Sequence, residues 1–247
     1  MGPDKKRWWL FPRKQGNFRT RLFCFPHAGA GGVVYHPWSR QLPEFIQVVA
    51  AHPPGRGFRF QETPFTNIND YVDTYYTQIL SYLDQPFAFF GHSMGTLVAY
   101  LLAQRLRDNG QPTPHTLFLS GRKAPHLPFT GPSLHSLPQA EFIAALEQRY
   151  GPDEALQNPD IAELVTPPLR ADIKMIETFE YKAASPLSMP FVLMTGRDDA
   201  VATPEAMKAW EQHTTETCTF HTFAGGHFYL HKDPQPLLRI IQPLMLR

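Results

Sequence analysis

The chain has 247 residues, 43% of them hydrophobic, which is enough for one large α/β domain or two small ones. Its formal net charge of +1 argues against nucleic acid as the main ligand, because a surface that follows a phosphate backbone normally carries excess basic residues. No apolar run approaches the roughly 20 residues of a membrane-spanning helix. The apolar run after the basic residues 5–7 is too short for a signal-peptide core. We therefore expect a cytoplasmic protein.

Apolar runs typical of buried strands alternate with segments of helical periodicity in the first half of the chain. The pattern predicts the following strands and helices: strands at 21–26, 45–51, 87–91 and 116–121, and helices at 37–42, 68–83 and 94–109. Such alternation predicts a mostly parallel sheet covered by helices on both faces. The cysteines Cys24 and Cys218 both fall in strand-like runs, so we expect buried free thiols rather than a disulfide.

The alternation stops between residues 122 and 188, where no convincing strand is found. This stretch contains predicted helices at 139–150, 159–165 and 169–181, and the pair Pro167–Pro168 is expected to separate the last two. An insertion of this size is more typical of a cap over an active site than of a linker. The alternation then resumes with predicted strands at 191–196 and 217–223 and predicted helices at 204–213 and 234–246. We interpret residues 1–247 as a single α/β domain with an inserted helical lid at 122–188.

A Gly-x-Ser-x-Gly pattern, Gly91-His92-Ser93-Met94-Gly95, joins a predicted buried strand directly to a predicted helix. A strand that turns at once into a helix holds its middle residue on a strained bend above the sheet. The flanking glycines leave room for the strand and the helix to pass closely. This context favours Ser93 as a nucleophile over an ordinary serine in a glycine-rich turn.

A serine hydroxyl needs a general base, and the base needs a group that orients it. In this arrangement the acid and then the histidine follow the serine in chain order, each on a loop after a strand. His227 follows the last predicted strand and is our candidate base. Asp199 and Asp198 both follow the strand at 191–196; we favour Asp199 as the acid and expect Asp198 to cap or orient the turn.

The sequence contains eleven histidines, so the histidines other than His227 must also be considered as the base. His92 is the neighbour of Ser93 but points away from the bend. His27, in the loop of small residues 27–32, is expected to line the pocket, whereas His221 and His231 are expected to pack or face solvent. Asp172 and other acids on helical faces are expected to be solvated or paired.

An oxyanion formed at Ser93 requires two hydrogen-bond donors. The backbone N–H of Met94, near the start of the helix, is one candidate, and the N–H of Ala28 in the loop 27–32 is the other. The glycines of this loop do not match the phosphate-binding pattern G-x-G-x-x-G, because Val34 stands where the last glycine should be. The sequence has no cluster of Cys and His with zinc spacing, so we expect neither a metal nor a cofactor.

Several motifs together resemble the type II (external, editing) thioesterases of polyketide and nonribosomal peptide synthesis, within the α/β-hydrolase superfamily. The motifs run from end to end of the chain: Leu22-Phe23-Cys24-Phe25-Pro26-His27-Ala28-Gly29, Pro54-Gly55-Arg56-Gly57-Phe58-Arg59, Gly91-His92-Ser93-Met94-Gly95, Leu169-Arg170-Ala171-Asp172, Pro204-Glu205 with Trp210, and Gly225-Gly226-His227-Phe228. The leader 8–19 also resembles that of the family, and we expect Trp8 and Trp9 to pack against the body.

The resemblance implies an α/β-hydrolase fold and a Ser93–Asp199–His227 triad. It also implies an oxyanion hole from Ala28 and Met94, with His27 and Phe228 contacting substrate. The implied partner is an acyl or peptidyl carrier protein that presents its acyl group on a phosphopantetheine arm, and the protein is expected to be a monomer. One departure is that Ala200 stands where the family usually has proline after the catalytic aspartate.

The residues alone predict a serine hydrolase acting on acyl carbonyls, and the preference for thioesters comes from the resemblance. An ester hydrolase or an acyltransferase of the same fold remains an alternative. A non-catalytic module that binds carrier proteins is disfavoured by the intact Ser93, Asp199 and His227.

Overall fold

The computed structural model describes residues 8–129 and 131–246, so the basic residues 5–7 lie outside the described chain. A seven-stranded sheet forms its centre, with the strand order β1-β3-β2-β4-β5-β6-β7. The strands are β1 (Trp9–Leu10), β2 (Thr20–Phe25), β3 (Ile46–Ala51), β4 (Phe87–His92), β5 (Leu117–Ser120), β6 (Phe191–Gly196) and β7 (Cys218–Phe223). β1 pairs with β3 antiparallel, and the pairs from β3 to β7 are parallel. The predicted α/β class with a mostly parallel sheet is therefore confirmed.

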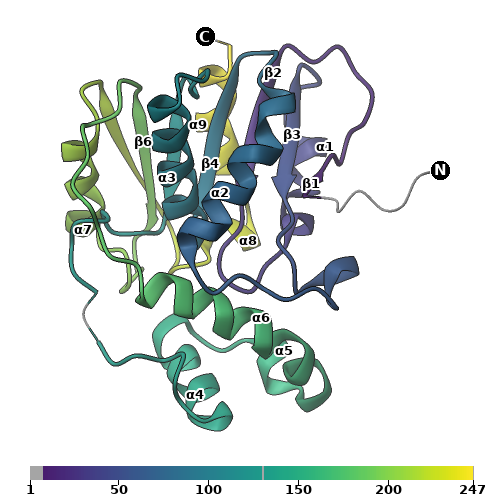
Figure 1. Cartoon of the computed structure of the whole chain (residues 1–247), viewed down its shortest axis with the longest axis vertical. Helices are drawn as coiled ribbons and strands as arrows, with labels where there is room; N and C mark the ends of the chain where they lie inside the picture. The colour runs from purple at the N-terminus through teal and green to yellow at the C-terminus, as the bar shows by residue number, and fades with distance from the viewer. Residues whose placement is uncertain (1–7, 130, 247) are drawn as a thin grey trace.

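Helices cover both faces of the sheet (Figure 1). The α-helices are α1 (Trp38–Gln41), α2 (Ile68–Ile79), α3 (Met94–Asp108), α4 (Gln139–Tyr150), α5 (Glu154–Gln157), α6 (Pro159–Glu177), α7 (Pro204–Lys208), α8 (Tyr229–Lys232) and α9 (Gln235–Leu244). Four short 3-10 helices join them: η1 (Gly32–Tyr35), η2 (Gly57–Arg59), η3 (Leu80–Tyr82) and η4 (Ala209–His213). α2, α3 and α7 pack on one face, and α1, α8 and α9 on the other. α5 and α8 were not expected from the sequence, whose short segments there show no clear periodicity.

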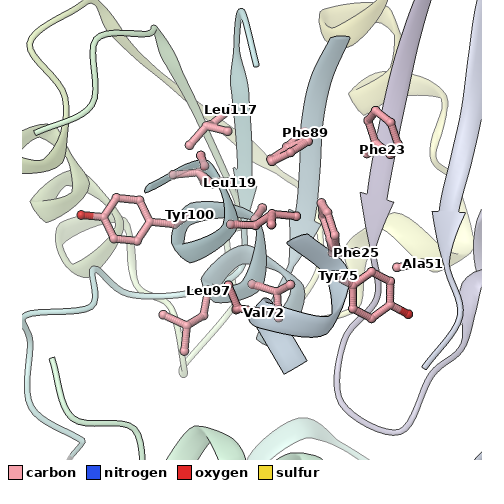
Figure 2. Packing of buried hydrophobic residues seen from close by; sticks show 14 of the residues in the cluster. Phe23, Phe25, Ala51, Val72, Tyr75, Phe89, Leu97, Tyr100, Leu117 and Leu119 are labelled. Carbon is pink, nitrogen blue, oxygen red and sulfur yellow. The ribbon is translucent and has the colours of Figure 1, made fainter. Parts of the chain in front are cut away.

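Alternate side chains of the strands divide the core into two layers. On β2, Phe23 and Phe25 pack toward α2 and α3, whereas Leu22 and Cys24 face the opposite layer. Figure 2 shows the first layer, where Phe89 and its neighbours lie between the sheet and the two helices. Burying each such aromatic side chain contributes roughly 1.5–3 kcal/mol. Both cysteines are free thiols, as expected, but only Cys24 is buried and Cys218 is half-buried.

The N-terminal leader adds a strand that the sequence did not predict. Trp9 lies in β1 opposite Ala51, and its indole packs edge-on against Phe23, Phe25 and Tyr75 with ring centroids 5.0–6.0 Å apart. The expected packing of the tryptophans against the body is present. A strand of two residues is too short to give a recognisable period, so only the packing could be foreseen.

The segment that we interpret as a lid contains α4, α5 and α6, which lie across the carboxyl ends of the parallel strands (Figure 1). The expected break at Pro167–Pro168 is wrong, because α6 runs through both prolines. Each internal proline costs a helix about 3 kcal/mol. The helix persists because contacts hold both halves: Asn158 caps its first turn, and Ile173 and Met175 are buried in its second half.

The helix α3 passes so closely over the sheet that two positions accept only glycine. A Cβ added to Gly91 would lie 2.2 Å from the carbonyl oxygen of Gly95, and one added to Gly95 would lie 2.0 Å from the carbonyl oxygen of Phe25. Both obstacles are backbone atoms, which cannot rotate away. This close crossing positions the turn between β4 and α3.

We predict that Gly95→Ala lowers the free energy of unfolding by more than about 3 kcal/mol, at the upper end of what overpacking costs. The control is Gly110→Ala: its added Cβ meets nothing within 4 Å, although the φ of +64° is strained for alanine. That strain alone costs about 1–2 kcal/mol. Denaturant unfolding measures both, and equal losses in the two variants would contradict the steric explanation.

Candidate active site

Ser93 occupies the turn between β4 and α3 with φ 54° and ψ −113°. Among the described residues it is the one non-glycine with a positive φ. Such a conformation costs about 1–3 kcal/mol and persists only where the surroundings enforce it. The Ser93 N–H donates to the carbonyl of Ser120 on β5 at 2.8 Å, and the Thr96 hydroxyl lies 2.6 Å from the same oxygen. The neighbouring strand therefore holds the strained turn in place.

The side chains of Ser93, His227 and Asp199 form a continuous hydrogen-bonded chain. His227 Nε2 lies 3.0 Å from Ser93 Oγ, and His227 Nδ1 lies 2.8 Å from Asp199 Oδ2. The three residues follow β4, β7 and β6, whose carboxyl ends meet at the same edge of the sheet. The structure thus brings together the three residues that the sequence selected, although they lie up to 134 positions apart.

Asp199, rather than Asp198, faces the imidazole. Asp199 is 3% exposed, and its second oxygen accepts from the N–H groups of Val201 and Ala202 at 2.8 and 3.1 Å. Burial works against the charged carboxylate, but the hydrogen bonds from His227 and these two amides outweigh it and lower the pKa of Asp199. The Asp198 side chain is exposed, and its N–H donates to the Gly225 carbonyl.

The two candidate oxyanion donors lie beside Ser93. Met94 is the first residue of α3, whose opening amides have no acceptor within the helix. The Ala28 amide belongs to the loop after β2 and donates no hydrogen bond to another described residue. Ala28 and Ser93 both line the same pocket. Both amides are therefore free to meet a negative charge there.

A buried ion pair holds the loop that carries Ala28. Arg56 binds Asp172 of α6 through two hydrogen bonds, of 2.6 and 3.1 Å, and the side chains are 7% and 1% exposed. Asp172 also accepts from the Gly29 N–H at 2.8 Å, and Arg56 donates to the Ala30 carbonyl at 3.1 Å. The pair thus connects the loop 27–32 to the lid helix. Asp172 was expected to be solvated or paired, and it is paired. The sequence did not predict its contact with the loop 27–32.

A cavity of about 460 Å³ opens beside Ser93 and is enclosed mainly by the lid. His27 and Phe228, the expected substrate-contacting residues, both lie in its wall, with ring centroids 5.0 Å apart. The acids Asp153 and Glu154 also line it, but its other large side chains from α4, α5 and α6 are apolar or aromatic: Leu146, Tyr150, Leu156, Val165, Leu169, Ile173 and Ile176. A cavity of this size and lining suits an acyl chain.

His231 is exposed and its ring stacks on that of Phe228, in line with the expectation that it packs or faces solvent, and it also contributes to this wall. It follows β7 in the short helix α8, where the chain returns toward the loop 27–32, and its ring centroid lies 4.9 Å from that of His27. A helix of four residues is too short to show a periodic pattern in the sequence. His92 lies outside the hydrogen-bonded chain, as expected, because its Nδ1 bonds to Ser120 Oγ at 2.8 Å.

The histidines around the cavity are held in their neutral forms. Burial, followed by the nearby His231, lowers the pKa of His27 to about 3. Burial, followed by the nearby His227, lowers the pKa values of His92 and His231 as well. The histidines of the site therefore add little charge at neutral pH, and the acids of the cavity wall are Asp153 and Glu154 at its exposed part.

Within the part of the chain that the structure describes, no group of three or more His, Cys, Asp or Glu side chains is arranged to hold a metal ion. No helix in the same ranges is long and apolar enough to cross a membrane.

The parallel sheet, the strained serine between a strand and a helix, and the chain order Ser93, Asp199, His227 are those of an α/β-hydrolase. Residues 20–245 match the family described as the thioesterase domain. The chain therefore belongs to the thioesterase family.

Named relatives narrow this assignment to the type II thioesterases. The type II thioesterase BorB from the borrelidin biosynthetic cluster shares 34% identity and a TM-score of 0.89, over 97% of this chain and 98% of that structure. The gramicidin S biosynthesis protein GrsT of Aneurinibacillus migulanus is 32% identical over 95% of this chain and 92% of its own length. The protein named linear gramicidin dehydrogenase LgrE, of Brevibacillus parabrevis, is 37% identical over 96% of this chain and 91% of its own length. In this chain the loop after β2 lacks the dinucleotide-binding pattern, as noted for Val34.

We predict that Asp172→Ala lowers the free energy of unfolding by about 3–5 kcal/mol, because it leaves the buried charge of Arg56 without a partner. Thioester turnover should fall as well, since the loop of Ala28 loses an anchor. Asp73→Ala is the control: Asp73 pairs with Arg105 at 2.7 Å, but the side chains are 51% and 40% exposed. Such a pair contributes at most about 1 kcal/mol. Similar losses in the two variants, measured by denaturant unfolding, would refute the role of the buried pair.

Proposed function

We propose that this protein hydrolyses acyl thioesters presented on the phosphopantetheine arms of acyl or peptidyl carrier proteins. Such a reaction removes stalled or aberrant acyl groups or releases an intermediate. The proposal is carried by one observation: the hydrogen-bonded chain of Ser93, His227 and Asp199 opens onto an apolar cavity under the lid. Membership in the type II thioesterase family supports the thioester and the carrier as substrate.

In the first step Ser93 attacks the thioester carbonyl while His227 takes the proton from its hydroxyl. The distance of 3.0 Å between Ser93 Oγ and His227 Nε2 suits this transfer. Asp199, 2.8 Å from Nδ1, holds the tautomer whose Nε2 is free to accept and stabilises the imidazolium that forms. The thiol of the arm then leaves, and an acyl-Ser93 intermediate remains.

The negative charge on the carbonyl oxygen is assigned to the amides of Ala28 and Met94. Each such donor contributes roughly 3 kcal/mol to the stability of the transition state. In the second step His227 deprotonates a water molecule that attacks the acyl-Ser93 carbonyl, and the proton returns to the serine. The acyl group lies meanwhile in the apolar cavity, whose wall includes His27 and Phe228.

The deciding experiment measures free thiol release from acyl-pantetheine and acyl-carrier substrates by the wild type and by Ser93→Ala. We expect turnover to fall about 10⁴-fold or more in the variant. Equal thiol release by both proteins would reject the nucleophile. Faster turnover of oxygen esters than of matched thioesters by the wild type would favour an ester hydrolase, and acyl transfer to an added acceptor would favour an acyltransferase.

The two aspartates after β6 give a matched pair of variants. Asp199→Asn should reduce turnover by about 10³–10⁴-fold, because an amide donor facing Nδ1 favours the wrong tautomer of His227. Asp198→Asn should change turnover little, since that side chain is exposed. The comparison uses kcat on one acyl-pantetheine substrate, and the reverse ranking would overturn the assignment of the acid.

A further inference from the structure

Three basic side chains gather where the lid segment leaves the sheet and where α4 ends. Arg122 and Lys123 come one residue after the end of β5, and Arg149 is the penultimate residue of α4. Lys123 Nζ lies 5.9 Å and Arg149 Cζ lies 5.4 Å from the centroid of the Phe129 ring, which is 41% exposed. We call Arg122, Lys123 and Arg149 the basic cluster.

No carboxylate neutralises this cluster within residues 8–129 and 131–246. Two buried cations elsewhere are paired: Arg56 binds Asp172, and Arg59 binds Glu62. By contrast, none of the three cluster residues forms an ion pair with a described residue. The Nε of Arg122 is buried and has no hydrogen-bond partner there. A buried donor without a partner costs about 1–3 kcal/mol, and an anion bound here would offset that cost.

The electrostatics of the cluster favour an incoming anion. Burial lowers the pKa of Arg122 to about 10. Burial, followed by the charges of Arg122 and Arg149, also lowers the pKa of Lys123. These groups therefore repel one another, and a bound anion would relieve the repulsion.

The cluster lies next to the triad but outside the wall of the acyl cavity. Gly121, the neighbour of Arg122, approaches His227 so closely that an added Cβ would lie 3.5 Å from its Cε1. Tyr150, the neighbour of Arg149, has its ring centroid 5.0 Å from that of His227. Tyr150 also lines the cavity, whereas the three cluster residues do not. The cluster thus follows residues that contact His227 but does not line the acyl cavity, which leaves it available to the arm of the leaving thiol.

We propose that the basic cluster binds the phosphate of the phosphopantetheine arm while the acyl chain occupies the cavity under the lid. This inference rests on the proposed function, because it concerns the same thioester substrate. The phosphate is the anion that such an arm carries, and lysine and arginine are its usual protein ligands. The exposed Phe129 ring lies within 6 Å of two of the cations, where it can cover the apolar part of the arm. A carboxylate at the end of the acyl group would instead lie in the cavity, whose wall lacks these cations.

The test compares two substrates with the same acyl group, acyl-4′-phosphopantetheine and acyl-pantetheine. We expect the wild type to prefer the phosphorylated substrate in kcat/KM by about tenfold or more, the range of hydrogen bonds to charged groups. Arg122→Gln and the double variant Lys123→Gln/Arg149→Gln should each reduce this ratio toward one. A general loss of activity affects both substrates equally and leaves the ratio unchanged. If Arg122→Gln does not fold, the double variant still tests the proposal. Arg239→Gln, on the exposed side of α9, is the matched control and should keep the wild-type ratio.

Two outcomes would overturn the proposal: a wild type that does not distinguish the substrates, or cluster variants that keep its ratio. A parallel pair, malonyl-pantetheine and propionyl-pantetheine, tests for a carboxylate on the acyl group. If the cluster variants lost discrimination only between malonyl-pantetheine and propionyl-pantetheine, the cluster would bind the acyl group, and the proposal that it binds the phosphate would be refuted. Failure of the proposed function looks different, because the wild type would then release thiol from none of these substrates.

Discussion

The close crossing of α3 over β2 and β4 is the constraint on which the site depends. Gly95 meets the backbone of β2 and Gly91 meets the backbone of Gly95, so the chain must turn within Ser93. That turn gives Ser93 its φ of 54°, and β5 fixes it through the carbonyl of Ser120. The packing of the buried cluster around α3, β2 and β4 offsets this backbone strain. The geometry of the site therefore depends on the packing of the core.

The second constraint connects the lid to the site. Asp172 belongs to α6, but its oxygens bind Arg56 and the amide of Gly29, one residue after the proposed oxyanion donor Ala28. A movement of this part of α6 would therefore disturb the loop 27–32, unless the ion pair breaks first. Breaking it would leave two buried charges unpaired, which is costly. The half of α6 that carries Asp172 is accordingly part of the rigid frame, and lid motion is more easily accommodated in α4 and α5, which lack such an anchor among the described contacts.

The sequence could predict the parts of this protein that depend on local chemistry. The glycines around Ser93, the acid loop after β6 and the histidine after β7 are each marked by residue type and by position after an apolar run, and the structure places all three together. The local sequence could not predict that α6 is continuous, because tertiary contacts at Ile173 and Met175 outweigh the helix-breaking cost of the two prolines. Likewise β1 consists of two residues and is held by the packing of Trp9. The pairing of Arg56 with Asp172 spans 116 positions, and only the joint presence of both residues in the resemblance motifs could have suggested it.

Charge is unevenly distributed around His227, and this asymmetry bears on the direction of the reaction. In the acyl cavity, burial lowers the pKa values of His27 and His231, and most of the large side chains of the wall are apolar. The basic cluster around Phe129 lies outside the lining of this cavity. A thioester of a phosphorylated arm has the same polarity, since its acyl end is apolar and its other end is anionic. A substrate bound in the reverse sense would bring its phosphate into the apolar cavity and leave the cations without a partner, which costs free energy on both sides. The proposed phosphate site and the acyl cavity together would therefore favour one orientation, in which the thiol leaves toward the cluster and the acyl group stays on Ser93 under the lid.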